Sequence, residues 1–134
     1  MEYSKIDKID RNLIDAASGV LDRNYFHPRH TVGSAVLCSS GKIYTGVNIE
    51  SVGYGPCAEV IAIGRAISEG ERQMKRIVTV GGPAVPHKVI SPCGNCRQLI
   101  VDYAPDCWVI LPHDGAIMKI KAMELLPDAY RHLV

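Results

Sequence analysis

Hydrophobic side chains recur every three or four positions near the start of the chain. This stripe runs through residues 6–21, with charged residues between its members, and consists of Ile6, Ile9, Leu13, Ile14, Ala17, Val20 and Leu21. The spacing matches the 3.6 residues of a helical turn. The pattern predicts an amphipathic helix whose apolar stripe needs a sheet or another helix to cover it.

Five later runs rich in apolar and β-branched residues predict strands. They lie at 31–38, 42–49, 75–82, 107–113 and 116–123, and a short tail follows to residue 134. The turn sequence Ser-Ser-Gly joins the first two runs, so these two are expected to form a β-hairpin.

Two further helices are predicted between these strands, and each begins at a proline. The first runs from Pro56 to about Gly70 and is apolar almost all round, so we expect it to be largely buried. The second occupies 91–105, with Pro92 in its first turn and Ser91 as its N-cap. Strands and helices that alternate in this way form right-handed crossovers, which place the helices against the sheet faces. The sequence therefore predicts an α/β fold, a three-layer helix-sheet-helix sandwich around a mixed five-stranded sheet.

The length and charge of the chain restrict its organisation and its partners. A chain of 134 residues can bury one substantial core, which predicts a single domain over 1–134. A net charge of +1 without a long Lys/Arg run speaks against nucleic acid as a partner. The first twenty residues carry charges every few positions, so they predict neither a signal peptide nor a membrane span. We expect a soluble, cytoplasmic protein.

Cysteines supply the first candidate chemistry. The chain has five, an odd number, and the cytosol keeps thiols reduced, so a disulfide framework is not expected. Cys93 and Cys96 form a C-x-x-C pair in the first turn of a predicted helix, where the positive end of the helix dipole favours thiolate. By itself this pair fits either half of a zinc site or a thioredoxin-like redox pair.

Cys57, in the stretch Gly-Pro-Cys-Ala-Glu, favours zinc. Taken alone, it could be a small core residue, with Glu59 a solvated acid in the first helical turn. Because Cys57 also follows a proline at a helix start, two such helices side by side would bring three thiolates together. Three protein ligands are typical of a catalytic zinc, which keeps one position for water. Other candidate ligands do not follow a helix start and are expected to be buried thiols or loop histidines: Cys38, Cys107, His27 and His30.

Glu59 stands two positions after Cys57. This separation is roughly 200° of helical rotation, so the two side chains diverge, but from the first turn the carboxylate can reach the open side of a metal. A carboxylate beside an activated water can take its proton and pass it on, as general base and then general acid. The expected chemistry is hydrolytic.

These residues resemble the signature of the zinc-dependent cytidine deaminase family, in which a His or Cys stands two positions before a Glu and P-C-x-x-C follows. Here the signature reads C-A-E at 57–59 and P-C-G-N-C at 92–96. The resemblance extends from VGSAV through TGVNIES and GPCAE to SPCGNCRQLI and ELLPDAY, which is most of the chain. Cysteine as the first ligand is similar to the compact branch that acts on free nucleosides, and this implies a homotetramer.

The resemblance implies a metal site and a proton shuttle. It assigns one zinc ion to three thiolates, those of Cys57, Cys93 and Cys96, and proton transfer to Glu59. Val60 stands where the family usually has an arginine that offsets the thiolate charge, and Arg97 is the expected substitute.

The resemblance also implies how substrate is held. Asn48 and Glu50 are expected to contact ribose hydroxyls, and the backbone around Ala58 and Ser91 to contact the pyrimidine and its leaving amine. His30 stands where the family has an aromatic ring against the base.

Two relatives within the family fit the sequence. Asn-Ile-Glu at 48–50 is similar to cytidine deaminases, whereas the short step from Asn48 to Cys57 and the ELLP segment are similar to blasticidin S deaminase, which lacks the acid at Glu50. A carboxylate can accept from a ribose hydroxyl and therefore favours a nucleoside. The expected function is zinc-dependent hydrolysis of cytidine or deoxycytidine to uridine or deoxyuridine and ammonia, in pyrimidine salvage. The alternatives are deamination of blasticidin S or another aminopyrimidine nucleoside, and a zinc or C-x-x-C redox module without hydrolytic activity.

Overall fold

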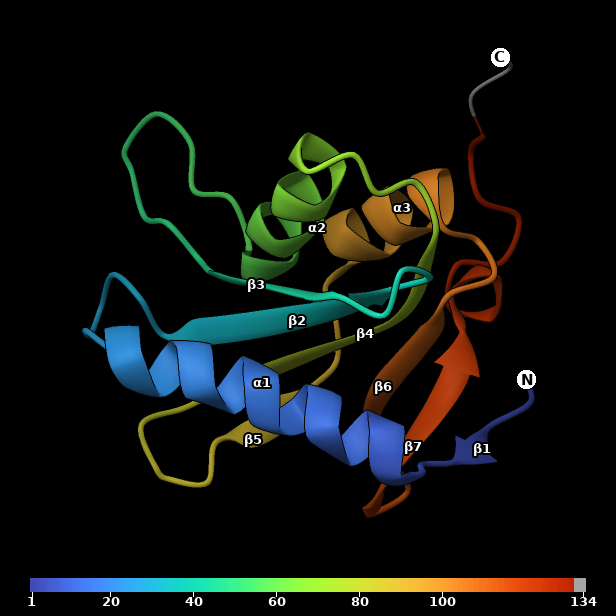
Figure 1. Ribbon diagram of the computed structural model, residues 1–134, viewed down its shortest axis with the longest axis horizontal. Helices are drawn as coiled ribbons and strands as arrows, with labels where there is room; N and C mark the ends of the chain where they lie inside the picture. Colours follow the sequence, from blue (N-terminus) through green and yellow to red (C-terminus); the bar gives the residue numbers. More distant parts are fainter. Residues whose placement is uncertain (132–134) are drawn as a thin grey trace.

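The computed structural model describes residues 1–131, which form one sheet with helices on both faces (Figure 1). Within this range the sheet has seven strands in the order β1-β7-β6-β4-β2-β3, with β5 paired to β4. The strands are β1 (Ser4–Lys5), β2 (Val32–Cys38), β3 (Ile43–Val47), β4 (Met74–Gly81), β5 (Lys88–Ile90), β6 (Trp108–His113) and β7 (Ala116–Lys121). The helices are α1 (Lys8–Asn24), α2 (Ala58–Ser68) and α3 (Gly94–Tyr103), followed by the 3-10 helix η1 (Ala122–Leu125). The last three residues of the expected tail, 132–134, lie outside the described range.

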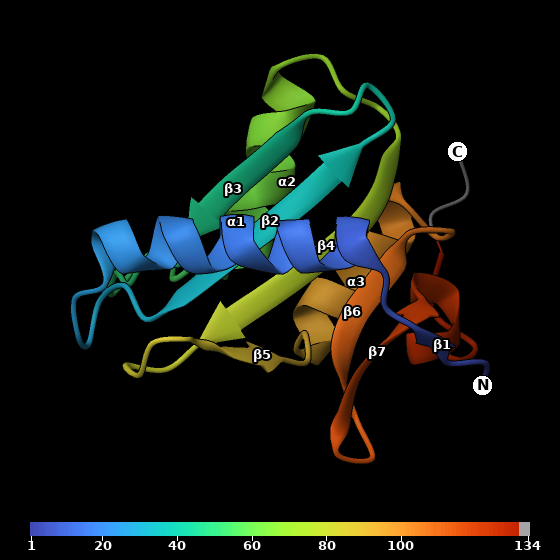
Figure 2. The same cartoon turned by 60° about the horizontal axis from the view of Figure 1, so that its bottom comes forward.

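The sheet separates two hydrophobic layers. Helix α1 covers one face, where it crosses in front of β2, β3 and β4 (Figure 2), and α2 and α3 cover the other face (Figure 1). Neighbouring residues of a strand point to opposite faces, so Val78 packs with Leu13 and Leu21 of α1 while Ile77 packs with the α2 and α3 layer. The predicted three-layer α/β sandwich is confirmed.

The sheet is mixed, as expected, but the predicted number of strands is wrong. β4 and β6 pair in parallel, whereas β2 pairs antiparallel with both β3 and β4, and β6 with β7. The five predicted strands are all present, and β1 and β5 add two more. These two are only two and three residues long, too short for an alternating pattern to indicate a strand.

One edge of β4 has two partners. Its first half, Arg76 to Val78, pairs with β6, and its second half, Thr79 to Gly81, pairs with β5. β5 leads directly into the segment before α3. This change of partner brings the start of α3 to the end of β4.

A buried ion cluster fixes α1 to the sheet. Asp7 and Asp10 form a reciprocal capping box at the helix start. Asp10 is fully buried and accepts hydrogen bonds from Arg76 of β4 at 2.7 Å and from Lys119 of β7 at 2.8 Å. The Asp7 carboxylate also pairs with both cations.

The starts of α2 and α3 differ slightly from the prediction. α2 begins at Ala58 with Cys57 as N-cap, and α3 begins at Gly94 with Cys93 as N-cap. The expectation that Ser91 caps the second helix is therefore wrong, because Pro92 lies before the cap rather than in the first turn. The close packing of α2 on β3 depends on Gly46, since a Cβ there would lie 2.7 Å from the backbone nitrogen of Ala62. No helix within residues 1–131 has the length and apolar character needed to cross a membrane.

Candidate metal centre and active site

The starts of α2 and α3 present their cap cysteines in the same conformation. Cys57 has φ −68° and ψ 159°, and Cys93 has φ −69° and ψ 169°. Because each thiol stands at the positive end of a helix dipole, both helices favour negative charge at the same place. Cys96 follows in the first turn of α3 and is fully buried.

The three sulfurs of Cys57, Cys93 and Cys96 lie within 4.8 Å of one another. The Sγ atoms of Cys57 and Cys93 are 4.0 Å apart. Zinc with Zn–S bonds of about 2.3 Å in tetrahedral geometry would hold its sulfurs roughly 3.8 Å apart, so the donor set fits this metal. In the described part of the chain, this is the only group of three potential metal-ligating side chains.

The other candidate ligands do not join this group. Cys38 and Cys107 are buried thiols of the core between the sheet and the α2 and α3 layer, as expected. Burial raises the pKa of Cys38 to about 11 and that of Cys107 to about 12. His30 uses Nδ1 in a contact with the Asn48 carbonyl oxygen at 2.8 Å.

Burial and mutual repulsion oppose full ionisation of the three thiols. Burial raises the pKa of Cys57 and Cys96, and the negative charge of Glu59 acts in the same direction. Burial also opposes ionisation of Cys93, but hydrogen bonds from the N–H groups of Cys96 and Asn95 and from the neighbouring thiols lower its pKa. A divalent cation stabilises coordinating thiols in their deprotonated form. The cluster is therefore suited to a cation.

Beside the thiols lies a cavity of about 250 Å³, somewhat smaller than most small-molecule sites, which span roughly 300–1,000 Å³. Seven of the residues singled out from the sequence line it: Asn48, Glu50, Cys57, Ala58, Glu59, Ser91 and Cys93. Glu59 is only 3% exposed, yet no group within residues 1–131 forms a hydrogen bond with its carboxylate. No fully buried side-chain oxygen or nitrogen of the described chain lacks a partner, so the Glu59 carboxylate is open to the cavity that it lines. A carboxylate beside the thiols that has no protein partner can act on a bound ligand, which makes this side chain the strongest catalytic candidate.

Asn48 links the segment 29–32, before and at the start of β2, with the segment 48–50 that follows β3. Its side-chain oxygen accepts from the N–H groups of Thr31 and Val32 at 2.9 and 3.0 Å. Its amide nitrogen donates to the Arg29 carbonyl oxygen at 3.1 Å and to Oε1 of Glu50 at 3.3 Å. Asn48 thus orients the Glu50 carboxylate at the cavity wall.

His30 and Arg97 do not belong to the residues that line the cavity. His30 contacts the backbone oxygen of Asn48 instead. The Arg97 guanidinium donates hydrogen bonds of 2.8–3.2 Å to the Ser91 hydroxyl, the Pro92 carbonyl and the Leu125 carbonyl. Arg97 therefore braces the segment before Cys93, and no hydrogen bond joins it to a thiol within the described chain.

Six lining residues were not predicted to belong to the site, namely Thr31, Val32, Gly55, Pro56, Thr79 and Ile90. Thr79 is the most informative, because it is a polar residue in the buried strand β4 and only 3% exposed. Its hydroxyl donates to Ser34 at 3.4 Å. A hydroxyl within the apolar run of 77–80 was the available signal, but nothing in the sequence alone connects it with the cysteines.

The fold and these three thiols beside an unpaired carboxylate define a zinc hydrolase. The family described as "Cytidine and deoxycytidylate deaminase zinc-binding region" matches residues 7–111. The chain belongs to this family, its activity is hydrolytic deamination and its cofactor is zinc. The alternative of a C-x-x-C redox module without hydrolytic activity is thereby set aside.

Individual relatives agree with this assignment. The chain is 38% identical to "Blasticidin-S deaminase" of Bacillus cereus, over 97% of this chain and 98% of that protein. It is 39% identical to "Cytidine deaminase" of Halalkalibacterium halodurans, over 78% of this chain and 80% of the relative. Its fold matches the crystal structure of cytidine deaminase from Burkholderia pseudomallei with a TM-score of 0.75 and 33% identity, covering 90% of this chain and 98% of that one.

Proposed function

We propose that this deaminase converts cytidine or deoxycytidine to uridine or deoxyuridine and releases ammonia. The observation that carries the proposal is the Glu50 carboxylate, which lines the cavity and is oriented by Asn48. A carboxylate fixed in this way can accept a hydrogen bond from a ribose hydroxyl, and such a site discriminates strongly against ligands without that hydroxyl.

In this proposal Cys57, Cys93 and Cys96 hold the metal and Glu59 moves the protons. Zinc, when bound, supplies the positive charge that lets a water molecule lose a proton near neutral pH. Glu59 takes that proton and delivers it to N3 of the pyrimidine while the water oxygen bonds to C4. A second transfer through Glu59 carries the remaining hydroxyl proton to the amine, the C4–N bond breaks, and ammonia leaves.

Other residues would hold the ring. The backbone around Ala58 and Ser91 lines the cavity and can contact the base and the leaving amine. His30 would lie against the base only after its ring turns toward the cavity, since its Nδ1 now contacts Asn48. Arg97 would offset thiolate charge from a distance, through the Ser91 and Pro92 segment that it binds.

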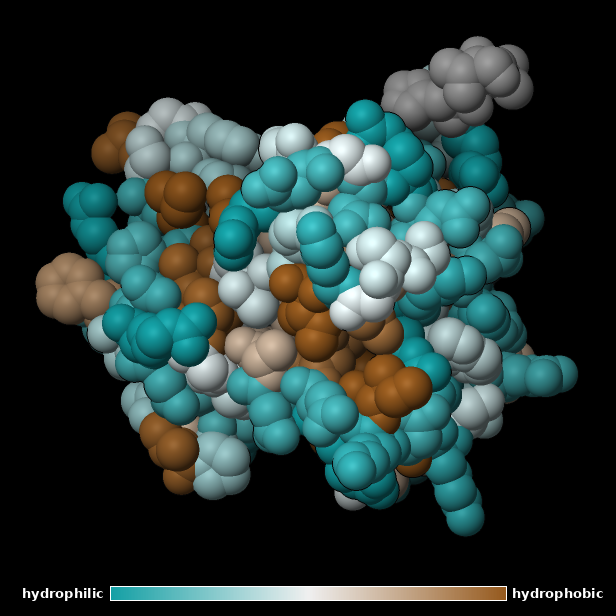
Figure 3. Space-filling model, viewed as in Figure 1, coloured by the Kyte–Doolittle hydropathy of each residue, from teal (hydrophilic) through white to brown (hydrophobic). Residues whose placement is uncertain are grey.

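We further propose that residues 1–134 act as one catalytic domain in a cytoplasmic homotetramer of pyrimidine salvage. Ile49, Val52 and Tyr54 are 43–110% exposed in the loop before α2, and Figure 3 shows apolar side chains at the surface over this loop. Such exposed groups favour a contact with a second subunit. Five free thiols fit a reducing compartment, and the small net charge fits a small-molecule substrate.

Blasticidin S is the second candidate substrate, because the blasticidin S deaminase of Bacillus cereus matches this chain almost from end to end. The test is a panel of cytidine, deoxycytidine and blasticidin S, followed by the ultraviolet change on deamination. We expect turnover of cytidine or deoxycytidine to exceed that of blasticidin S. Activity on blasticidin S without activity on either nucleoside would reverse the order.

A further inference from the structure

The end of β4 is flanked by two segments that contribute to the wall of the deaminase cavity. Gly81, the last residue of β4, pairs with Val32 of β2 on one edge and with Lys88 of β5 on the other. Val32 lines the cavity, as does Ile90, the last residue of β5. The position of β5 beside β4 therefore determines where the Ile90 side chain stands in the site.

Strand β5 is too short to hold this position by pairing alone. It has three residues, and in the described part of the chain it pairs with β4. Two-stranded pairing is marginal in water and needs further packing. Neighbouring side chains of a strand point to opposite faces, so Val89 packs on the α1 layer while Ile90 points to the cavity side. β5 therefore contacts the α1 layer on one face and lines the site on the other.

His87, the residue before β5, provides a second attachment to α1. Its side chain is 2% exposed, and both ring nitrogens have oxygen partners. Nδ1 lies 2.6 Å from the carbonyl oxygen of Gly82, the residue after β4. Nε2 lies 2.5 Å from Oδ1 of Asp22, in the last turn of α1. A carbonyl oxygen can only accept, so Nδ1 donates to it, and the contact with the Asp22 carboxylate is a charge-assisted hydrogen bond.

Tyr25 completes this contact from the connection between α1 and β2. Its ring lies nearly parallel to that of His87, with ring centres 6.3 Å apart and planes 14° apart. The same connection leads to Thr31 and Val32, which line the cavity. Figures 1 and 2 show the loop between β4 and β5 beside the C-terminal end of α1. The side chains of Asp22, Tyr25 and His87 thus join the chain entering β2 to the chain entering β5.

We propose that Asp22 and His87 are positioning residues of the deaminase, whose hydrogen bond holds β5, and with it Ile90, in place at the cavity. Neither residue lines the cavity, so they act on the substrate through β5. The proposed metal ligand Cys93 has a separate support, because Arg97 of α3 donates to the segment before it. Loss of the hydrogen bond should therefore weaken substrate binding while zinc and the chemical step are retained.

Asp22 is the residue to change, because its side chain is 44% exposed and its removal leaves no cavity in the core. In the zinc-loaded enzyme, Asp22→Ala should raise KM about fivefold, change kcat less than about twofold and speed amide hydrogen exchange of residues 82–91 about tenfold. Asp22→Asn can still form the hydrogen bond and should restore most of the lost affinity. The substrate is the one that the parent protein turns over best among cytidine, deoxycytidine and blasticidin S, so the test does not depend on which of them is preferred.

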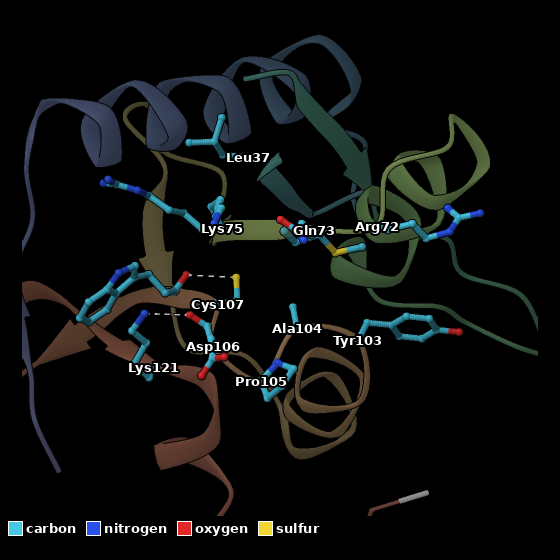
Figure 4. Close-up of a pocket in the computed structure, with 13 residues that line it drawn as sticks. Leu37, Arg72, Gln73, Lys75, Tyr103, Ala104, Pro105, Asp106, Cys107 and Lys121 are labelled. Atoms are coloured by element: carbon cyan, nitrogen blue, oxygen red, sulfur yellow. Dashed lines mark hydrogen bonds between the residues drawn. The ribbon is translucent and has the colours of Figure 1, made fainter. Parts of the chain in front are cut away.

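Two other aspartates are controls for the loss of a carboxylate. Asp15 is exposed on the same helix, and Asp106 is exposed in the loop between α3 and β6, where Figure 4 shows it at a separate cavity beside the start of β4. Asp15→Ala and Asp106→Ala should leave KM and the exchange of residues 82–91 unchanged. The proposal is overturned if Asp22→Ala keeps the parent's KM and exchange, if either control alters them equally, or if Asp22→Ala loses zinc and kcat together.

Discussion

The amide nitrogen of Asn48 donates to Oε1 of Glu50 at 3.3 Å, while the side-chain oxygen of Asn48 accepts two backbone N–H groups from Thr31 and Val32. All four hydrogen-bonding capacities of this amide are occupied. A direct contact of Asn48 with a ribose hydroxyl would therefore require the amide to exchange one of these partners, whereas the Glu50 carboxylate that it orients can reach a ligand without such an exchange.

This relationship predicts a specific effect of changing Glu50. Glu50→Gln should raise KM for cytidine about tenfold or more with little change in kcat, because a charged acceptor for a ribose hydroxyl is lost. The same variant should discriminate less between cytidine and 2′,3′-dideoxycytidine. Steady-state kinetics on both substrates measures this, and an unchanged preference would remove Glu50 from the ribose site. Ser51→Ala, at the exposed next position, is the control.

Zinc content should depend on the three thiols and on no other cysteine. Cys57→Ala should reduce bound zinc to less than about a tenth of the parent value, because two thiolates and water rarely hold this ion. Cys107→Ala, which removes a buried thiol far from the cluster, should retain it. Metal analysis of the two purified variants measures their zinc content per chain. Zinc retained in Cys57→Ala would contradict the assigned ligand set.

The buried ion cluster should be the main electrostatic contribution to stability. Asp10→Asn leaves Arg76 and Lys119 without their shared buried partner, and removing one member of such a cluster costs about 3–5 kcal/mol. Asp15→Asn, an exposed position of the same helix, should change the free energy of unfolding by less than about 0.5 kcal/mol. Urea unfolding at pH 7 measures the free energy of unfolding of both variants. Equal stability of the two would refute the stabilising role of the buried ion cluster.

Asp7 should make stability depend on pH in the acid range. The Asp10 N–H group lowers the pKa of Asp7 well below its ordinary 3.8, with burial opposing and Arg76 and Lys119 assisting. The folded state thus binds fewer protons than the unfolded state, so the contribution is complete above about pH 5 and is lost as the pH falls through the folded pKa. Asp7→Asn should therefore lower stability at pH 6 more than at pH 3. Urea unfolding across this range tests the sign, and a parallel loss at both pH values would contradict it.

Local signals explain why the metal site could be predicted. Pro56 and Pro92 mark two helix starts, and a cysteine follows each of them. Thiols at helix N-termini favour metal binding, and the spacing of Cys93 and Cys96 places both on one side of their helix. These two signals predict a three-thiol site without knowledge of the strand order. The same reasoning misplaced the cap at Ser91, because a proline can stand either before the cap or in the first turn.

Contacts between distant segments could not be predicted. Lys119 meets Asp10 across 109 positions of sequence, and both look like surface residues when read locally. Thr79 lines the cavity beside the thiols because the hydrogen-bonding partner of β4 changes there from β6 to β5. Strand partners and buried charges of this kind depend on the complete sheet, whereas a residue pattern reports only its own segment.

Glu59 provides the most direct test of the proposed chemistry. Glu59→Gln keeps the size of the side chain and the three thiols but cannot accept and release a proton, so it should bind zinc like the parent protein and lose roughly 10²–10⁴-fold or more in kcat for cytidine. Zinc content and cytidine turnover are measured on the same preparation. Full zinc with almost no turnover is the predicted result, whereas full zinc with turnover close to that of the parent would contradict the account.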